Sequence, residues 1–439
     1  MSSESALIFA LLCAERPGGD RAPTMGGEVA LEPRSEVSEA GFDPSRIERV
    51  RTYFDGFVAA GRVAGWLVTL SRGGELVWSA RGGERDRERG LAVADDTIWR
   101  LYSMTKPVTA VCAMMLYEEG AFDLNDEVSR WIPEFAEPRV YLGGPVGALR
   151  TRPAATPIRV HHLFTHTAGL TYGFQNTNPV DALYRSMGYD ETRWVFPEGI
   201  DLEGAVADWA SAPLLFDPGT AWNYSVAIDV LGRLVEIWSG ERLDAFVARR
   251  LLEPLGMVDT TWSCREADRD RLAMLYVNWE GQAVAVPDLA EAATKPPTLL
   301  TGGGGLLSTA ADYERFMAML VGGGTFDGVR YLTERSVRLM GSNLLTGGGT
   351  LAEMSCDTFS EVGQAGVGYG LGVATLVDPA ANRSLVSPGT ISWGGAASTY
   401  FWVDRAEGLS VALYAQLLPS TSYPWRRALQ QLVYSAMLG

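Results

Sequence analysis

Lysine and histidine are scarce in this chain of 439 residues. Of its 37 basic residues only Lys106 and Lys295 are lysines, so arginine supplies the generic positive charge. Because arginine stays protonated at working pH whereas a desolvated lysine can lose its proton, each lysine needs a specific reason. Histidine occurs only at positions 161, 162 and 166, which leaves few places for general-base chemistry by histidine.

Cysteine and long apolar runs are also scarce. The four cysteines, at positions 13, 112, 264 and 356, lack the C-x-x-C spacing of a zinc site or redox dithiol, so we expect isolated buried thiols. No apolar run approaches the ~20 residues that span a bilayer. The apolar stretch at residues 6–14 is short for a signal peptide and has no Lys or Arg before it. We therefore expect a cytoplasmic protein with no membrane partner, with export as the alternative.

Positive charge is in deficit as well. Acidic residues outnumber basic ones by 53 to 37, which gives a formal net charge of −16. Such a charge repels phosphate backbones, so nucleic acid is excluded as a partner. The 47% of hydrophobic residues suffices for a sizeable core. At roughly 100 to 200 residues per domain, the length predicts two or three domains.

The first part of the chain predicts a leader, a helix and a hairpin, in that order. Residues 15–40 are rich in proline, glycine and charge without apolar periodicity, so we predict a flexible leader over residues 1–40. Asp43-Pro44-Ser45 then begins a helix, with a capping carboxylate before a proline in the first turn. A hairpin follows over residues 65–80.

The rest of the chain divides into a helical part and a strand-rich part. Between residues 120 and 299 we predict helices joined by long loops, with no cluster of strand signals. Four strands are then predicted, at residues 369–377, 384–393, 398–403 and 409–416, before a helix at 425–438. The pattern predicts an α+β fold: one antiparallel sheet built from residues 41–119 and 300–439 and flanked by helices, with a mostly helical domain inserted at 120–299. A functional site is expected at the seam between them.

The sharpest chemical signal is Ser103-Met104-Thr105-Lys106, an S-x-x-K motif at the start of a helix predicted over residues 103–119. Residues i and i+3 share a helix face, so the hydroxyl and the amine can come within hydrogen-bond distance. A serine hydroxyl needs a base to become a good nucleophile, and a desolvated neutral lysine is such a base. The positive end of the helix dipole favours both an alkoxide-like oxygen and a neutral amine. We therefore predict Ser103 as nucleophile and Lys106 as its base.

A second candidate lies in Trp222-Asn223-Tyr224-Ser225, just before a helix predicted from residue 227. A tyrosine beside a cationic lysine has a lowered pKa and can pass a proton between nucleophile and leaving group. Tyr224 is one of 16 tyrosines, and most tyrosines simply pack their rings. On residue chemistry alone, ring packing therefore stays open as the alternative.

A third candidate is Ser392-Trp393-Gly394-Gly395-Ala396, at the end of a predicted strand. Two glycines let a backbone approach a substrate closely, and an N–H at a strand edge is a suitable donor to an oxyanion. Glycine pairs in strands also mark bulges and turns, which is the alternative.

These three segments, in this order, resemble the serine β-lactamase and penicillin-binding superfamily, and most closely the family VIII carboxylesterases, which share the class C β-lactamase fold. The resemblance spans residues 42–437 and includes segments 163–170, 254–257 and 303–309. It implies Ser103 as acylated nucleophile, Lys106 as base, Tyr224 as the tyrosine of the second motif, oxyanion N–H groups on Ser103 and Ala396, and substrate binding by Trp393, Gly394 and Gly395. It implies no metal and no organic cofactor.

Two departures from the β-lactamase pattern bear on the substrate. The second motif of class C enzymes reads Tyr, any residue, Asn, whereas Tyr224-Ser225-Val226 ends in an apolar side chain. The third reads Lys-Thr-Gly, whereas this chain has Trp393-Gly394-Gly395, the form seen in family VIII esterases. A β-lactam carboxylate requires a cation there, which tryptophan does not supply. The resemblance therefore implies a serine carboxylesterase that acts on short-chain, uncharged small-molecule esters through an acyl-enzyme.

Other enzyme classes fit less well. An α/β-hydrolase needs a G-x-S-x-G elbow, which this chain lacks. A zinc hydrolase using His162 and His166 would need glutamate after the first histidine, where Leu163 stands. Four activities on the same fold stay open: a β-lactamase, a D-amino-acid peptidase or amidase, an acyltransferase, and a penicillin-binding sensor that is acylated once. The sequence does not predict the oligomeric state.

Overall fold

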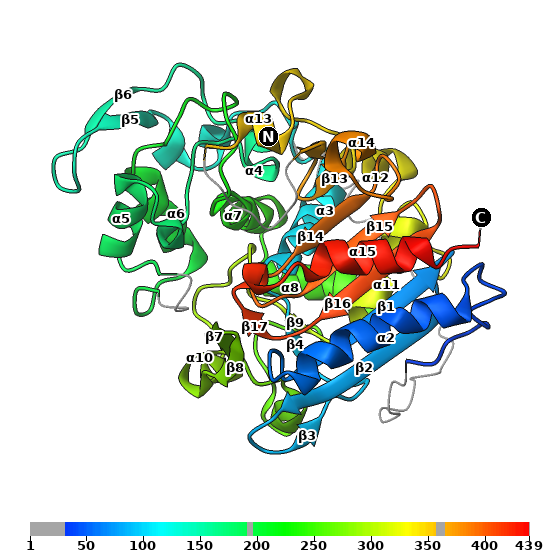
Figure 1. Cartoon of the computed structure of the whole chain (residues 1–439). Coiled ribbons are helices and arrows are strands. Elements are labelled where there is room, and N and C mark those ends of the chain that lie inside the picture. The colour runs from blue at the N-terminus through cyan, green and yellow to red at the C-terminus, as the bar shows by residue number, and fades with distance from the viewer. Residues whose placement is uncertain (1–30, 191–195, 357–364, 439) are drawn as a thin grey trace, which may run out of the picture.

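The computed structural model describes residues 31–190, 196–356 and 365–438, and an eight-stranded antiparallel sheet lies at its centre (Figure 1). The strand order is β12-β13-β14-β15-β16-β1-β2-β3. The strands are β1 (Gly65–Arg72), β2 (Glu75–Asp86), β3 (Leu91–Ala92), β12 (Val367–Tyr369), β13 (Ala374–Leu376), β14 (Ile391–Gly394), β15 (Tyr400–Asp404) and β16 (Leu409–Tyr414). Since β1 pairs with β16, the sheet is built from both chain ends, as predicted.

Two terminal helices cover one face of this sheet. α2 (Pro44–Ala59) begins at the Asp43 cap and lies beside α15 (Trp425–Ser435) in front of the sheet (Figure 1). Along β1, Trp66, Val68 and Leu70 face these helices, whereas Leu67 faces the opposite core. This alternation is the period-2 pattern of a strand buried on both faces.

The opposite face carries the helix that follows the S-x-x-K motif. α3 (Thr105–Glu118) is buried from Thr105 to Leu116 and packs against α7 (Ala227–Ser239) and α8 (Leu243–Val247). α11 (Ala310–Val321), capped by Thr309, lies against β1, β15 and β16. Because α3 is enclosed on all sides, its sequence is more apolar than a helix with one buried face requires.

The region between residues 120 and 299 is mostly helical but contains two hairpins that the sequence did not predict. They are β5 (Arg139–Gly143) with β6 (Arg150–Pro153), and β7 (Tyr276–Trp279) with β8 (Gln282–Ala285). Both are short, and the first is rich in arginine and largely exposed, so neither has a strong apolar alternation. β7 also pairs with β17 (Leu417–Leu418), which attaches this segment to the C-terminal part of the chain. The predicted division at residue 299 therefore lies later in the chain than this attachment.

The remaining elements are short. The helices are α4 (Val160–Phe164), α5 (Pro179–Ser186), α6 (Leu202–Ser211), α9 (Glu253–Leu255), α10 (Pro287–Glu291), α12 (Glu334–Met340), α13 (Leu351–Met354) and α14 (Pro379–Asn382). The strands β4 (Trp99–Arg100) and β9 (Leu307–Ser308) pair with each other, as do β10 (Thr325–Phe326) and β11 (Val329–Arg330). The strand predicted at 384–393 is confined to its C-terminal end, and the one predicted at 369–377 is two strands, because Gly372 turns the chain with a φ of +81°.

Residues 31–40 contact the sheet, although they fall in the predicted leader. Arg34 N–H donates to Leu76 O at 2.8 Å, and Leu31 is buried. The rest of the leader, residues 1–30, lies outside the described residues, as does Cys13. Cys112 and Cys264 are free and buried as predicted, whereas Cys356 is free but exposed, because it follows the short helix α13 at the surface.

None of the helices among the described residues is both long and apolar enough to cross a bilayer. The cytoplasmic location rested on residues 6–14, which are not described, and it stays a prediction.

A buried glutamate beneath the sheet makes stability depend on pH. Glu314 of α11 accepts hydrogen bonds from the hydroxyls of Thr69 and Ser71. Burial raises the pKa of Glu314 to about 7 from its ordinary value of 4.5, although the two hydroxyls oppose this shift. The folded state therefore holds this proton more tightly than the unfolded state, and stability is lost as pH rises from about 4.5 through 7.

Glu314→Gln is expected to be more stable than the wild type at pH 9 by about 1 to 3 kcal/mol, since a pKa unit corresponds to about 1.4 kcal/mol. At pH 4.5 the difference should disappear, because the wild-type carboxyl is then protonated as well. Urea unfolding at the two pH values measures the effect, with the exposed Glu334→Gln as control. A stability difference that does not change with pH would contradict this account.

Candidate active site

Ser103 lies where a short strand meets the central helix. After β4, a 3₁₀ turn over Tyr102–Met104 leads directly into α3. Met104 N–H donates to Leu101 O at 3.2 Å, and Tyr313 OH donates to Met104 O at 3.0 Å. Tyr102 has a φ of +48°, a left-handed conformation that costs a residue with a side chain about 1 to 3 kcal/mol. The fold thus holds Ser103 on a strained turn.

Ser103, Lys106 and Tyr224 meet around one hydroxyl oxygen. Lys106 Nζ donates to Ser103 Oγ at 3.2 Å, and Tyr224 OH donates to the same oxygen at 2.5 Å. Lys106 Nζ also lies 4.5 Å from the centre of the Tyr224 ring. Lys106 and Tyr224 are only 1% and 2% exposed, so these interactions act in a low dielectric. The structure therefore brings together the three side chains that the sequence predicts for catalysis.

A carboxylate that sequence reasoning missed fixes the other side of Lys106. Lys106 Nζ donates to Gly303 O at 2.6 Å, and Gly303 N–H donates to Asp229 Oδ1 at 2.9 Å. Tyr172 OH donates to Asp229 Oδ2 at 3.4 Å. Burial raises the pKa of Asp229, while the charge of Lys106 acts in the opposite direction. The available signal was an aspartate on the buried face of an otherwise apolar helix start, Ala227-Ile228-Asp229-Val230-Leu231.

His166 is a second residue at the site to which the sequence assigned no role. Its ring centre lies 4.9 Å from that of Tyr224, and its Nδ1 lies 3.2 Å from Ser225 Oγ. Burial, together with the nearby charge of Lys106, holds the pKa of His166 well below its usual value. The ring is therefore neutral and adds no second cation beside Lys106. Its position just after α4, with a side-chain hydrogen bond, agrees with the expected loop residue.

The third motif reaches the nucleophile turn through a close backbone contact. A Cβ at Gly395 would lie 2.2 Å from both Leu101 O and Thr399 Oγ1, so only glycine fits at this position. Gly395 N–H donates to Thr399 O at 2.8 Å, which turns the chain after β14. For the described residues, no backbone hydrogen bond is recorded from the N–H of Ser103 or of Ala396. Both N–H groups are thus available for the predicted oxyanion contacts.

Trp393 and Gly394 are enclosed by other side chains. Trp393 is 1% exposed, and its ring centre lies 5.5 Å from that of Tyr224 and 5.1 Å from that of Tyr369. A Cβ at Gly394 would lie 2.5 Å from the Arg426 guanidinium. The indole therefore packs directly against the candidate catalytic tyrosine. Direct contact of Trp393, Gly394 and Gly395 with substrate stays a prediction.

The other two histidines bind the backbone. His161 Nδ1 lies 2.9 Å from Leu124 O, and His162 Nδ1 accepts the Arg159 N–H at 3.1 Å. Burial lowers the pKa of His162 to about 3. Across residues 31–190, 196–356 and 365–438, no three His, Cys, Asp or Glu side chains are grouped so as to hold a metal ion. The prediction that no metal or organic cofactor is needed stays a prediction.

Comparison with known proteins gives consistent matches. The Beta-lactamase family model matches residues 50–434. Esterase EstB of Burkholderia gladioli is 31% identical over 432 residues, which cover 93% of this chain and 99% of the esterase. Protein Rv1367c of Mycobacterium tuberculosis is 36% identical over 368 residues, covering 83% of this chain and 88% of its own. The solved structure of EstCE1, a hydrolase with promiscuous acyltransferase activity, covers 90% of this chain and 99% of its own at 25% identity and a TM-score of 0.74.

The matched region contains the sheet, the helical insertion and all three motifs. It confirms the class C β-lactamase-like α+β fold and the resemblance to the family VIII carboxylesterases. The chain belongs to the beta-lactamase family and is a serine hydrolase.

Proposed function

We propose that this protein is a carboxylesterase that hydrolyses short-chain esters of small molecules through an acyl-enzyme on Ser103. The observation that carries the proposal is the single oxygen, Ser103 Oγ, that binds both Lys106 Nζ and Tyr224 OH. The ester class is supported by two relatives, EstB and the lovastatin esterase of Penicillium rubens, which is 27% identical over 376 residues.

In the first half of the proposed reaction, Ser103 Oγ attacks the ester carbonyl carbon while its proton passes to neutral Lys106 Nζ. The carbonyl π electrons move to the oxygen, where the N–H groups of Ser103 and Ala396 stabilise the negative charge. The oxyanion then collapses and the bond to the alkoxy group breaks. The proton reaches the departing alkoxide through Tyr224 OH, so an alcohol leaves and the acyl group stays on Ser103 Oγ.

In the second half, a water molecule attacks the acyl carbon and gives its proton to the pair formed by Tyr224 and Lys106. The same two N–H groups hold the second oxyanion. When it collapses, the bond to Ser103 Oγ breaks, the proton returns to that oxygen and the carboxylic acid leaves. Gly303 O and Asp229 keep Lys106 in place through both halves.

Acyl transfer to an alcohol is the second candidate, and one observation favours it. EstCE1, a hydrolase with promiscuous acyltransferase activity, shares the fold over 90% of this chain. The acyl-enzyme is common to both reactions, and only the acceptor differs. An alcohol acceptor added to the ester assay would give a new ester in addition to the free acid if the second candidate holds.

The enzyme is expected to hydrolyse 4-nitrophenyl butyrate efficiently and the cephalosporin nitrocefin weakly. The third motif carries Trp393 where β-lactamases carry lysine, so the lactam carboxylate finds no ion pair there. A charge-assisted hydrogen bond contributes about 1.5 to 3 kcal/mol, and its loss corresponds to roughly a ten- to hundredfold lower kcat/KM. Steady-state assays on both compounds and on a D-amino-acid anilide measure this preference.

The same assays separate the remaining alternatives. Equal rates on nitrocefin and the butyrate ester would replace the esterase proposal with a β-lactamase. Preferential cleavage of the anilide would indicate a peptidase or amidase. A single stoichiometric burst without further product would indicate a sensor that is acylated once.

A further inference from the structure

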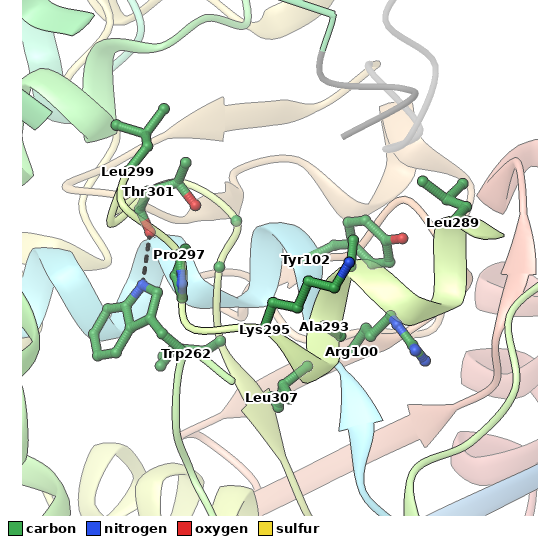
Figure 2. A pocket seen from close by; sticks show the side chains of 14 residues that line it. Arg100, Tyr102, Trp262, Leu289, Ala293, Lys295, Pro297, Leu299, Thr301 and Leu307 are labelled. Atoms are coloured by element: carbon green, nitrogen blue, oxygen red, sulfur yellow. Dashed lines mark hydrogen bonds between the residues drawn. The ribbon is translucent and has the colours of Figure 1, made fainter. Parts of the chain in front are cut away.

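A pocket lies directly behind the nucleophile turn. It encloses about 490 Å³, part of it open to solvent, which is a size that small ligands occupy. Tyr102, which precedes Ser103, forms one wall, and Gly304 and Gly305, which follow the Lys106-binding Gly303, form another. In Figure 2, Tyr102, Lys295, Arg100 and Leu289 gather at one end of this pocket and Trp262 and Thr301 at the other. The pocket thus adjoins two backbone segments of the candidate active site.

The charge of this pocket is opposite to that of the whole chain. Its 14 lining residues include Arg100 and Lys295 but no aspartate or glutamate, in a chain with a net charge of −16. Lys295 is exposed, and no ion pair involves it among the described residues. Glu291, the acid nearest to Lys295 along this helix end, lies 3.6 Å from Arg269 and is paired with it. The pocket is therefore a local cationic site.

Arg100 is the more informative of the two cations. It is 6% exposed, and its guanidinium donates to three neutral acceptors: Ala273 O at 2.5 Å, Ala290 O at 2.7 Å and Gln416 Oε1 at 3.3 Å. Its Nε–H is buried and has no hydrogen-bond partner within the described chain. A buried cation without an anionic partner costs several kcal/mol, so an anion at this position would be strongly favoured.

The donors that stay open on Arg100 match one chemical group. Nη2 uses one of its two N–H groups on Ala290 O, which leaves the other beside the unpartnered Nε–H. These two adjacent donors form the planar fork that binds both oxygens of a carboxylate. Leu289, Ala293 and Leu307 supply an apolar lining for the carbon chain that carries such a group.

We propose that the pocket formed by Arg100, Lys295 and Tyr102 binds a carboxylate beside the nucleophile turn. The carboxylate comes either from the far end of the substrate's own acyl chain or from a separate small organic acid. The first source rests on the proposed esterase function, whereas the second does not. The cation that is missing from the third motif is thus supplied on the opposite side of Ser103.

The substrate source is tested with matched pairs of 4-nitrophenyl esters. Mono-4-nitrophenyl succinate, glutarate and adipate are compared with the butyrate, valerate and hexanoate esters, so that in each pair a terminal carboxylate replaces a methyl group. At the chain length that reaches the pocket, kcat/KM for the half-ester should exceed that of its neutral partner by about tenfold. Lys295→Met should reduce this ratio at least about fivefold, whereas Arg335→Met, the same charge change at an exposed position, should preserve it.

The separate source is tested without turnover. Titration calorimetry with glutarate on Ser103→Ala protein should show binding that Lys295→Met, added to it, weakens at least about fivefold. Lys295 is used for both tests because replacing Arg100 would also remove three hydrogen bonds that hold the surrounding backbone.

Each outcome has one meaning. A half-ester preference that depends on Lys295 supports the pocket and identifies the substrate as its source. Ratios near one, together with glutarate binding that depends on Lys295, support the pocket with a separate acid as its ligand. Ratios near one without glutarate binding, or effects that ignore Lys295, overturn the proposal. If the esterase function itself fails, the neutral esters show no turnover, while the calorimetric test still reads the pocket.

Discussion

Ser103→Ala is expected to lower kcat for 4-nitrophenyl butyrate by about 10⁴-fold or more, the scale on which loss of a catalytic serine acts in serine hydrolases. The loss should be this large because every later step uses the acyl group on Ser103 Oγ. Lys106 and Tyr224, which both bind this oxygen, would have no proton to manage. Initial rates at saturating substrate measure the change, and the melting temperature shows that the variant is folded.

A labelling experiment makes the same assignment without kinetics. A serine-reactive phosphonate should add its mass to the peptide that contains Ser103, and to no peptide of the Ser103→Ala variant. Ser186→Ala, at an exposed serine whose hydroxyl donates to Leu183 O, serves as the control and should react like the wild type. Labelling at another serine, with Ser103→Ala still active, would remove Ser103 from the mechanism.

Lys106→Arg is expected to reduce kcat by at least about a hundredfold, the low end of the effect of removing a general base. The variant keeps a cation, but a guanidinium stays protonated at working pH and accepts no proton from Ser103. The position is also tight, because Lys106 Nζ lies 2.6 Å from Gly303 O and 3.2 Å from Ser103 Oγ. Comparison with Lys106→Met separates loss of the base from loss of the charge.

The control for this prediction is the opposite exchange at the surface. Arg335→Lys alters an exposed side chain and should preserve full activity and stability. Near-normal kcat in Lys106→Arg would show that Lys106 acts through its charge alone. Lys106→Met should then be the only one of the two Lys106 variants that is inactive.

The catalytic triangle could be predicted because its parts are locally encoded. Ser103 and Lys106 share one helical turn, so their proximity follows from spacing alone. Tyr224 and the Gly395 segment came from the order of motifs, since nothing in their local sequence says what they face. Asp229 was missed because its role depends on Gly303, which is 74 positions away along the chain.

The fold was predictable to the extent that apolar patterns reported burial. The terminal helices and the hairpin at β1 and β2 have clear periodicity, and the structure places them as expected. The hairpins β5–β6 and β7–β8 were missed because they are short and partly exposed. The pocket behind Tyr102 could not be predicted, since Arg100 and Lys295 are brought together only by the path of the chain between them.

The topology of the sheet has a consequence for synthesis on the ribosome. Leu101, beside the nucleophile, binds Thr399 across 298 residues of chain, and β1 obtains its second neighbour only when β16 has emerged. At about 5 to 20 residues per second, translation leaves roughly 15 to 60 seconds between the two. During that interval the nascent chain carries Ser103 without the third motif, and the apolar strand β1 has one open edge. A chaperone that shields this edge would protect the chain until its last strands arrive, and the serine becomes reactive only at the end of translation.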